Sequence, residues 1–406
     1  MAKDGEFERL PLRSNPTGQG LLLIGLALLA FGVVMVYSAS TSLKAREAWF
    51  ASTVVRHFIF AGAGGLLMCL LWMVDYHRLA RGRRVPVLAG ILLLISLCLA
   101  IIVLIPGIGA EINGARRWLQ IGPRDKGLGF QPSELVKLSL TIFLACWLGR
   151  SSVNPRSFWT TFLPVAALIG TCVGLVIIED FGTAAVIGVT AAAVMLLAGV
   201  PWYYLLSVLP AAAVGFYFFV MLVPNRMSRI HAFMNPSNDA VVATYNVQQA
   251  LIAIGSGGIW GKGLGYGTQK LGYVPEDHTD YIFTVICEEL GFVGAALLLG
   301  LFLLFLYNSW RASTRAGDKT GSLLSGGLGL LITLQMLVHV AVNIGSAPPK
   351  GIGLPLVSAG GTSLMLIAAA VAVIVSVTAH RYSSPESGGF PVDLVNRPAD
   401  KSERKR

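Results

Sequence analysis

Charged side chains are scarce in this 406-residue chain. Asp, Glu, Lys and Arg make up 13% of the residues, whereas soluble domains carry about a quarter. The chain also lacks any polar, periodic stretch long enough to form a soluble domain. Apolar residues make up 54% of it, and they gather in runs of roughly 18 or more, the length that crosses a bilayer as a helix. We therefore expect one integral membrane domain.

Metal-ligand and disulfide spacings are absent as well. The chain has five cysteines, and all lie inside apolar runs without a Cys-x-x-Cys pair: Cys69, Cys98, Cys146, Cys172 and Cys287. This pattern supports neither a disulfide framework nor a zinc site. His231, His278 and His339 also lack metal-like spacing. The net charge of +10 comes from short basic loops between apolar runs, a pattern typical of membrane orientation and lipid headgroups rather than of nucleic-acid binding.

Ten apolar runs predict an all-α integral membrane protein with about ten transmembrane helices, because lipid offers an open backbone no hydrogen-bond partner. The runs cover residues 19–39, 56–75, 85–106, 132–149, 160–178, 183–199, 202–223, 281–307, 322–345 and 364–380. The first run is long and further runs follow it. We therefore interpret it as an uncleaved anchor rather than a signal peptide.

The distribution of Lys and Arg predicts that both termini are cytoplasmic. With that orientation, more than half of the 31 basic residues lie on the cytoplasmic side, although the outer segments are much longer. The chain then divides into a cytoplasmic N-terminal segment (1–18), a membrane domain (19–380) and a disordered basic cytoplasmic tail (381–406). Three extracytoplasmic segments remain: 107–131, 224–280 and 346–363. The second is the largest and forms a loop between the seventh and eighth helices.

A glycine-rich stretch at residues 255–268 invites comparison with a nucleotide-binding loop. A P-loop needs Gly five residues before its Gly-Lys pair, but Ser256 stands there, and Gly263 replaces the Ser or Thr that binds magnesium. The stretch also lies on the side of the membrane that lacks ATP. We reject nucleotide binding and expect these glycines to make close backbone turns around a groove.

Acidic residues gather around the start of the eighth apolar run, in Pro275-Glu276-Asp277-His278-Thr279-Asp280. One interpretation is that Thr279 or Asp280 caps the helix that follows. The other is a carboxylate acting as a general base at the membrane surface. Glu288 and Glu289 follow within the run. Ionisable residues at that depth indicate function by default, although they can also hold helices together.

The first outer segment contains Asn113-Gly114-Ala115-Arg116-Arg117-Trp118 and is followed by Gln131-Pro132-Ser133-Glu134-Leu135-Val136-Lys137. Two guanidinium groups suit a diphosphate, but they could equally meet lipid headgroups. Trp118 is either a substrate contact or an interfacial anchor. Pro132 and Ser133 suit a helix start, and Glu134 with Lys137 pairs on one helix face. That pair is either functional or a packing salt bridge.

The third outer segment, residues 347–363, is too rich in Pro and Gly for a regular helix. It must therefore be buried in protein or line a wet cavity. Lys350 is its lone cation, and Ser358 lies near its end.

Taken together and in this order, these segments resemble the SEDS family (shape, elongation, division and sporulation proteins). The likeness covers residues 19–380 and rests on several stretches: Gly-Ala-Arg-Arg-Trp-Leu, Gln-Pro-Ser-Glu-Leu-Val-Lys, Gln-Ala-Leu-Ile-Ala-Ile-Gly-Ser-Gly-Gly, Gly-Thr-Gln, Pro-Glu-Asp-His-Thr-Asp-Tyr-Ile-Phe and Leu-Pro-Leu-Val-Ser-Ala-Gly-Gly-Thr-Ser. Pro349-Lys350-Gly351 and the doubled Arg116-Arg117 resemble the FtsW-like division branch more than the RodA-like elongation branch. The chain departs from the family pattern at Ala359 (usually Tyr), at Asn246 (usually Gln) and at Glu179-Asp180-Phe181-Gly182 (commonly Pro-Asp-Leu-Gly).

The resemblance implies a peptidoglycan glycosyltransferase that polymerises lipid II at the outer face of the cytoplasmic membrane during septal wall synthesis. It implies that Asp280 is the catalytic carboxylate and that polyprenyl diphosphate is the leaving group. The substrate-binding candidates are Arg116, Arg117, Trp118, Glu134, Lys137, Arg229, Gln249, Lys350 and Ser358. We expect no metal site and no cofactor, with a divalent cation left open.

The resemblance also implies a partner, a class B penicillin-binding protein acting as transpeptidase, together with other divisome membrane proteins and membrane lipids. Two other functions remain open at this stage. A lipid II flippase would use charges inside the membrane such as Glu134 and Glu288. A non-catalytic scaffold would recruit the transpeptidase without polymerising lipid II.

Overall fold

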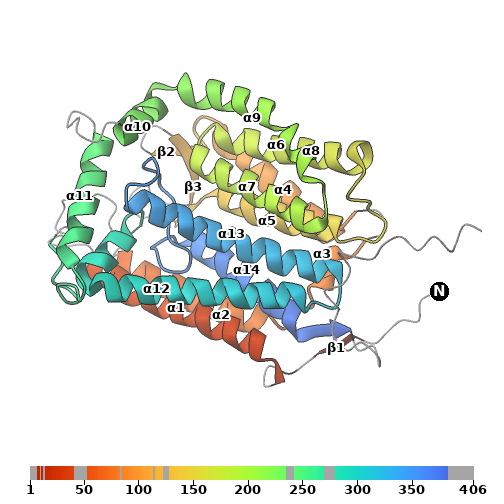
Figure 1. Cartoon of the computed structure of the whole chain (residues 1–406), viewed down its shortest axis with the longest axis horizontal. Helices are drawn as coiled ribbons and strands as arrows, with labels where there is room; N and C mark the ends of the chain where they lie inside the picture. The colour runs from red at the N-terminus through yellow and green to blue at the C-terminus, as the bar shows by residue number, and fades with distance from the viewer. Residues whose placement is uncertain are drawn as a thin grey trace, which may run out of the picture.

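The computed structural model describes residues 7–9, 11, 14–40, 53–82, 85–112, 115–121, 128–234, 242–268 and 279–382. Most of them form α-helices: α1 (Pro16–Ser40), α2 (Thr53–Leu71), α3 (His77–Ala80), α4 (Val87–Leu104), α5 (Pro132–Leu148), α6 (Leu163–Ile177), α7 (Phe181–Ala198), α8 (Trp202–Leu206), α9 (Leu209–Phe216), α10 (Pro224–Met234), α11 (Val242–Gly257), α12 (Ile282–Thr314), α13 (Lys319–Asn343) and α14 (Thr362–Ala379). Two π-helical turns adjoin α6 and α9: η3 (Phe158–Phe162) and η4 (Tyr217–Met221). Most of the helices run roughly along the long axis of the molecule (Figure 1).

The expected bundle of apolar helices is confirmed. Within the described residues, nine helical segments are long and apolar enough to cross a membrane, and each coincides with an apolar run of the sequence. The remaining expected span, 132–149, is α5, which has 17 residues and carries Glu134 and Lys137 in its first two turns. Pro132 begins this helix, as its fixed φ favours.

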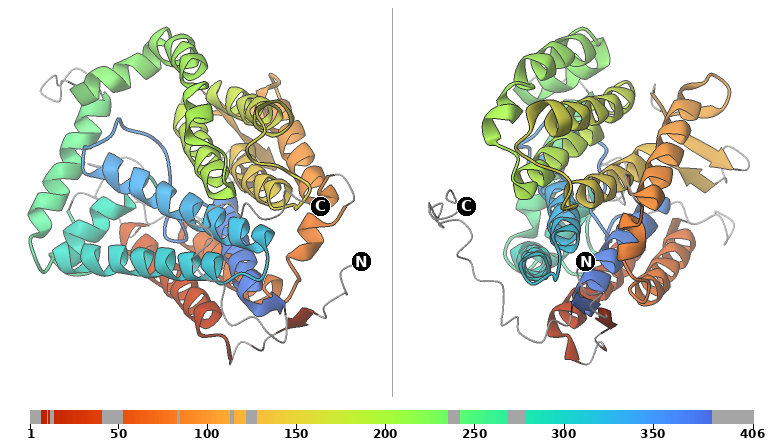
Figure 2. Two further views of the ribbon diagram at one scale, coloured as in Figure 1. Left: turned by 45° about the vertical axis from the view of Figure 1, so that its right-hand side comes forward. Right: turned by 90° about the vertical axis from the view of Figure 1, so that its right-hand side faces the viewer.

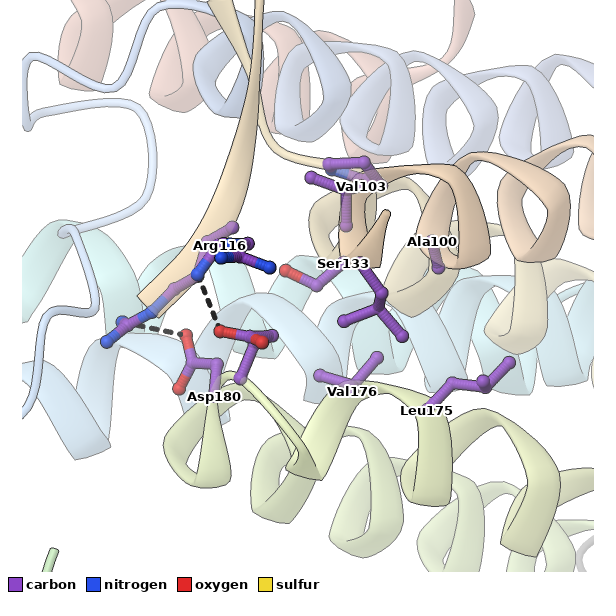
Figure 3. A pocket seen from close by; sticks show the side chains of 11 residues that line it. Ala100, Val103, Arg116, Ser133, Leu175, Val176 and Asp180 are labelled. Carbon is purple, nitrogen blue, oxygen red and sulfur yellow. Dashed lines mark hydrogen bonds and ion pairs between the residues drawn. The ribbon is translucent and has the colours of Figure 1, made fainter. Parts of the chain in front are cut away.

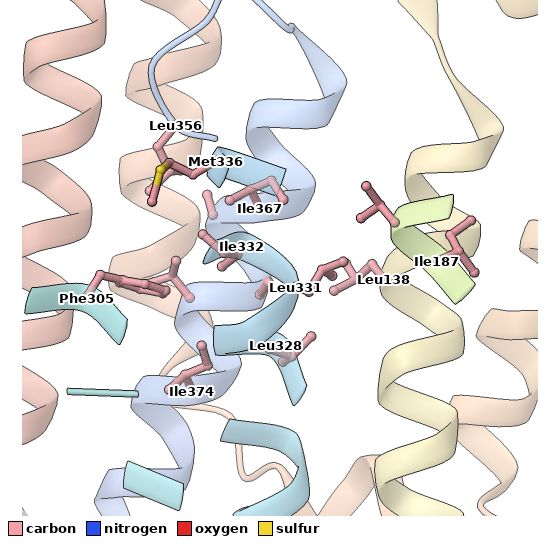
Figure 4. Packing of buried hydrophobic residues seen from close by; sticks show 14 of the residues in the cluster. Leu138, Ile187, Phe305, Leu328, Leu331, Ile332, Met336, Leu356, Ile367 and Ile374 are labelled. Carbon is pink, nitrogen blue, oxygen red and sulfur yellow. The ribbon is translucent and has the colours of Figure 1, made fainter. Parts of the chain in front are cut away.

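The core is built around α13, which packs against α5, α7, α12 and α14. In its most apolar stretch, 72% of the residues are buried. Leu331 and Ile332 on α13 lie in the cluster that Phe305 of α12, Ile374 of α14 and Leu138 of α5 also join (Figure 4). Because most of α13 is buried against neighbouring helices, its apolar residues lie on several faces rather than in a single stripe.

The span made of α8, α9 and η4 lies at the edge of the bundle (Figures 1 and 2). Only 6% of the residues in its apolar stretch are buried inside the protein. It leads into α10 and α11, which lie within the long outer segment 224–280. α11 packs against α12, and Ala250 and Ala253, at a helical spacing of three, are fully buried.

Two small sheets complete the fold. The strands β2 (Gly109–Ile112), β3 (Ala115–Ile121) and β4 (Leu128–Phe130) pair antiparallel in the first outer segment. The strands β1 (Phe7–Arg9) and β5 (His380–Tyr382) pair antiparallel and bring the two ends of the bundle's chain together. Both ends therefore lie on the same side of the bundle. The expected boundary at residue 381 falls inside β5, and residues 383–406 of the expected tail lie outside the described residues.

Candidate active site

Asp280 lies just before Tyr281, the N-cap residue of α12, which begins at Ile282. Two neighbours hold its backbone. Asn343 of α13 donates its side-chain N–H to the Asp280 carbonyl oxygen at 3.0 Å, and Ser358 donates its hydroxyl to the Thr279 carbonyl oxygen at 2.7 Å. The segment Pro275-Glu276-Asp277-His278 lies outside the described residues.

The Asp280 carboxylate lies against the backbone of Gly351. A Cβ on Gly351 would stand 2.9 Å from Asp280 Oδ2, a separation that real Cβ atoms do not tolerate. The glycine therefore lets the carboxylate approach the Pro/Gly-rich segment closely. This contact places Asp280 next to the residue that precedes Gly351, which is Lys350.

Residues 346–361 form irregular backbone, as the sequence predicts, and side chains from α13 satisfy it. Gln335 donates to the Gly353 carbonyl oxygen at 3.0 Å, and Nδ1 of His339 lies 2.7 Å from the Ile352 carbonyl oxygen. Within the segment, the Leu354 N–H donates to the Ser358 hydroxyl at 2.7 Å. Such bonds are required where non-helical backbone is buried at membrane depth. They fix the segment that carries Lys350.

Lys350 joins this segment to the start of α7. Its Nζ lies 4.2 Å from the centroid of the Phe181 ring, a cation–π contact. A Cβ on Gly182 would stand 2.8 Å from Lys350 Cδ, so the lysine stem packs on α7 backbone. Burial lowers the pKa of Lys350, with Asp180 acting to raise it and Arg229 to lower it. The cation is partly desolvated and is therefore ready to interact strongly with an anion.

Asp180 caps α7 by accepting the Thr183 N–H at 3.1 Å and the Thr183 hydroxyl at 2.9 Å. Nη1 of Arg117 lies 3.7 Å from the same carboxylate. Its neighbour Glu179 accepts the backbone N–H of Arg116 at 2.6 Å. The two acids therefore fix β3, which carries both arginines, to the start of α7. The role of Glu179 had no signal in the sequence beyond the departure from the family pattern.

α10 adds a cation that the sequence analysis missed. Arg226 donates to the Phe219 carbonyl oxygen at 2.6 Å and also to the Ile178 carbonyl oxygen, so it ties α10 to η4 and to the end of α6. Burial lowers the pKa of Arg226, and the charge of Glu179 acts to raise it. The pKa of Tyr281 is raised to about 12, chiefly by burial and then by the Asp280 charge, while Arg229 opposes the rise.

The cluster around Asp280 is thus defined by the acids Glu179 and Asp180 and by four cations whose charges act on one another or on these acids. The cations come from three segments far apart in sequence: Arg117, Arg226, Arg229 and Lys350. The structure brings together four of the expected residues here, since Asp280, Arg117, Arg229 and Lys350 all belong to this cluster. Arg116 sits at its edge, with Nη2 3.3 Å from Glu111.

Glu134 and Lys137 lie apart from that cluster, in a buried hydrogen-bond network. Lys137 Nζ donates to both oxygens of Glu134 at 2.9 Å and to Gln335 at 2.6 Å, and Ser363 donates to Glu134 at 2.6 Å. The exposed fraction of Lys137 is 3%. The pair therefore connects α5 to α13 and to the start of α14. This arrangement favours a packing salt bridge over a substrate contact.

The remaining expected residues have mixed surroundings. Ser358 bonds backbone on both sides, as described above. Trp118 packs on Gly129 across the outer sheet, where a glycine Cβ would stand 3.1 Å from its ring. Gln249 is half-buried on α11. A substrate role for each of the three stays a prediction.

The glycine-rich stretch packs against a break in α12 at Gly291, where φ is +66°. A Cβ on Gly261 would stand 2.2 Å from the Glu289 carbonyl oxygen, so the expected close backbone approach is confirmed, against α12 rather than around a groove. Lys262 Nζ lies 2.7 Å from Glu288, which also accepts the Thr268 N–H at 2.9 Å. Ser38 donates to Glu289 at 2.5 Å. Glu288 thus joins α12 to the glycine-rich stretch, and Glu289 joins α12 to α1.

A small pocket opens beside the cluster (Figure 3). Ala100 and Val103 of α4, Ser133 of α5 and Val176 of α6 line it, and Asp180 lies at its charged end. Among the described residues, no group of three or more His, Cys, Asp or Glu side chains is arranged to hold a metal ion.

Comparison with known proteins identifies the family. The model of the FtsW, RodA and SpoVE family, described as "Cell cycle protein", matches residues 19–383. This chain belongs to that family. A protein of Trichlorobacter lovleyi named "Probable peptidoglycan glycosyltransferase FtsW" is 35% identical over 94% of the chain and 98% of its own length.

Two solved structures show the same fold. The first comes from a study of the "coordination of polymerization and crosslinking by a peptidoglycan synthase complex". It is 30% identical with a TM-score of 0.70 and covers 89% of this chain and 97% of its own. The second is the rod shape determining protein RodA of Thermus thermophilus, also 30% identical, with a TM-score of 0.63 over 90% and 97% of the two chains. The chain is thus a multi-pass protein of the cytoplasmic membrane and a peptidoglycan glycosyltransferase by family.

Proposed function

We propose that this chain polymerises lipid II into glycan strands for septal wall synthesis, with Asp280 as general base. The observation that carries the proposal is the contact between the Asp280 carboxylate and Gly351, beside Lys350. This contact joins the carboxylate to the segment that carries Lys350, one of the clustered cations, and supports the proposal. A glycosyl transfer that releases a diphosphate needs both kinds of group within one site.

Asp280 would accept the proton of the attacking sugar hydroxyl. As that oxygen forms its bond to the anomeric carbon of the donor, the bond from this carbon to the diphosphate oxygen breaks, and its electron pair leaves with the diphosphate. Displacement from the opposite face converts an α-linked donor into a β-linked strand. A positioned carboxylate contributes about 10²–10⁴-fold to such a step.

Lys350 and Arg117 would stabilise the negative charge that grows on the diphosphate. Both are held before substrate arrives, Lys350 by the Phe181 ring and Arg117 by Asp180. Fixed cations in a water-poor site stabilise developing charge more strongly than mobile ones in solvent. We also propose that Arg229 contributes, because its charge acts on Tyr281 and on Lys350.

Purified protein in proteoliposomes with labelled lipid II tests the proposal. Asp280→Asn should lower the polymerisation rate by about 10²-fold or more while leaving the melting temperature nearly unchanged. Asp75→Asn, the same chemical change between α2 and α3, is the matched control and should retain activity. Equal activity of Asp280→Asn and wild type would refute a general-base role.

The same liposomes separate the rival functions. Translocation of lipid II without polymer would support a flippase, for which the buried Glu134–Lys137 pair is the candidate charge pathway. Neither polymer nor translocation would support a scaffold. We further propose that a class B penicillin-binding protein is the partner, as a transpeptidase that crosslinks the product. Co-purification of the two proteins, with and without crosslinking of the glycan product, tests that part.

A further inference from the structure

The first turn of α12 takes its cap from another helix. Tyr281 occupies the N-cap position, and its side chain makes no capping hydrogen bond. The N–H groups of a first turn need an acceptor, which is usually the side chain of the N-cap residue itself. Here Oδ1 of Asn343, the last residue of α13, accepts the Thr284 N–H at 3.2 Å and the Thr284 hydroxyl at 2.8 Å. The start of α12 is therefore fixed to the end of α13, which lies beside it (Figure 1).

The other half of the same amide holds Asp280. Nδ2 of Asn343 donates to the Asp280 carbonyl oxygen at 3.0 Å and to the His339 carbonyl oxygen at 2.9 Å. A primary amide can accept two hydrogen bonds at its oxygen and donate two from its nitrogen. Asn343 makes all four, and it is fully buried. A buried amide whose bonds are all made is held in one orientation, because any rotation would leave several polar groups unpaired.

The two peptide groups that flank the Cα of Asp280 are both held. The Asp280 carbonyl oxygen, on one side, accepts from Asn343. The Thr279 carbonyl oxygen, on the other side, accepts the Ser358 hydroxyl at 2.7 Å. Because peptide groups are planar, holding both planes fixes φ and ψ of Asp280 and so the direction of its Cα–Cβ bond. Only the side-chain torsions remain, and the close approach of Gly351 restricts them.

We propose that Asn343 is a positioning residue for the glycosyl transfer, which caps α12 from α13 and thereby sets the direction in which Asp280 presents its carboxylate. The inference rests on the proposed function, because it concerns the base of that reaction. A general base must keep its oxygen within hydrogen-bond reach of the hydroxyl that it deprotonates. Capping by the Asp280 carboxylate itself would engage the oxygens that the reaction needs as proton acceptors. The amide of Asn343 supplies the cap instead.

Steady-state polymerisation of lipid II by the full-length protein in proteoliposomes, measured well below the Tm of each variant, tests the role of Asn343. We expect Asn343→Ala to lower kcat about 10- to 100-fold, because small displacements of a catalytic group are costly, and to leave the KM for lipid II nearly unchanged. Asp318→Ala is the control. Asp318 caps the other end of α13, where it accepts the Gly321 N–H at 3.2 Å and the Tyr76 hydroxyl. Its loss should lower Tm by a similar amount and leave kcat unchanged.

A double-mutant cycle with Asp280→Asn separates positioning of the base from general support of the fold. If Asn343 acts through the Asp280 carboxylate, Asn343→Ala should lower the residual rate of Asp280→Asn by less than about twofold. A loss of the same size in both backgrounds would overturn the inference, because Asn343 would then support the site as a whole. An unchanged kcat in the single variant Asn343→Ala would overturn it as well.

A milder variant decides the matter if Asn343→Ala does not fold. Thr284→Val removes only the hydroxyl that bonds Asn343 and should lower kcat about threefold, whereas Thr284→Ser keeps the hydroxyl and should match wild type. Equal kcat for all three proteins would overturn the inference. The proposed function fails separately, since it is refuted when Asp280→Asn alone is as active as wild type. An inactive Asp280→Asn together with an unaffected Asn343→Ala would overturn the inference and leave the function standing.

Discussion

Removing the carboxylate of Glu134 leaves Lys137 as a buried cation with one remaining partner. Lys137 Nζ bonds both oxygens of Glu134 and the side-chain oxygen of Gln335, and only 3% of the residue is exposed. Breaking a buried ion pair from one side costs about 3–5 kcal/mol. Because Gln335 stays, we expect Glu134→Leu to cost about 3 kcal/mol, near the lower limit.

Removing both charges should restore part of that loss. A double variant with Glu134→Leu and Lys137→Met leaves no unpaired charge, and apolar replacements of buried ion pairs are often neutral or stabilising. Two neighbours still lose a bond, since Ser363 donates to Glu134 and Gln335 accepts from Lys137. Each loss costs about 1 kcal/mol. The double variant should therefore melt above the single variant and somewhat below wild type.

Thermal unfolding followed by tryptophan fluorescence, with lipid II polymerisation measured well below each melting temperature, checks the prediction. For a chain of this length, a loss of about 3 kcal/mol corresponds to a fall in Tm of roughly 3–4 °C. If the pair only holds α5 against α13, the double variant regains activity as it regains stability. A stable double variant with a much higher KM would refute the packing interpretation and place these side chains in contact with substrate.

Three further predictions concern the outer site and the glycines. Burial lowers the pKa of Lys350, so its charge is lost as the pH rises through a range below that of a free lysine. The KM for lipid II should rise there, and Lys350→Arg, whose guanidinium stays charged, should delay the rise; identical alkaline limbs would contradict this. Gly351→Ala should lower kcat by about ten- to a hundredfold with Tm nearly unchanged, because its Cβ would stand 2.9 Å from the Asp280 carboxylate; an unchanged kcat would show that the contact does not position the base. Gly261→Ala should lower Tm by several degrees, because φ is +77° and its Cβ meets the Glu289 carbonyl, whereas Gly255→Ala, which meets nothing within 4 Å, should not.

The sequence predicted the helices well because the bilayer leaves a long apolar run almost no other structure. The runs at 85–106 and 364–380, for example, became α4 and α14 with ends shifted by only a few residues. The same physics identified residues 346–361 as irregular backbone that must be buried in protein. The hydrogen bonds from Gln335 and His339 are the form this burial takes.

The outer elements could not be predicted in the same way. In the segment 224–280, α10 is amphipathic, and α11 has only 16 residues and mixes apolar with polar side chains, so neither formed a long apolar run that hydropathy could identify. The β2–β3–β4 sheet is short, and its pairing depends on register rather than on composition. Arg226 was missed for a related reason. Its role depends on two backbone carbonyl oxygens, that of Phe219 in η4 and that of Ile178 at the end of α6. Neither bond has a pattern in the sequence that would predict it.

Glu134 and Lys137 show where motif reasoning stops. Their spacing at i and i+3 predicted the pairing correctly, but spacing alone does not say whether a paired charge faces a substrate or a neighbouring helix. The deciding information is the third and fourth partners, Gln335 and Ser363, which lie about 200 residues away along the chain. For Asp280, by contrast, the structure favours the catalytic interpretation of the motif. Its capping and catalytic interpretations both predicted a place before α12, and only the contact with Gly351 brings it to the cations.

The acids of the outer site have a consequence for how it handles a diphosphate. Asp180 bonds Thr183 at the start of α7 with both oxygens, so its contact with Arg117, at 3.7 Å, is long and weak. Glu179 bonds the backbone of β3 rather than a guanidinium group. These acids thus orient the cations without fully neutralising them. A diphosphate would meet guanidinium and ammonium groups that are already in place, and it would not have to break a short ion pair before its own charge is stabilised.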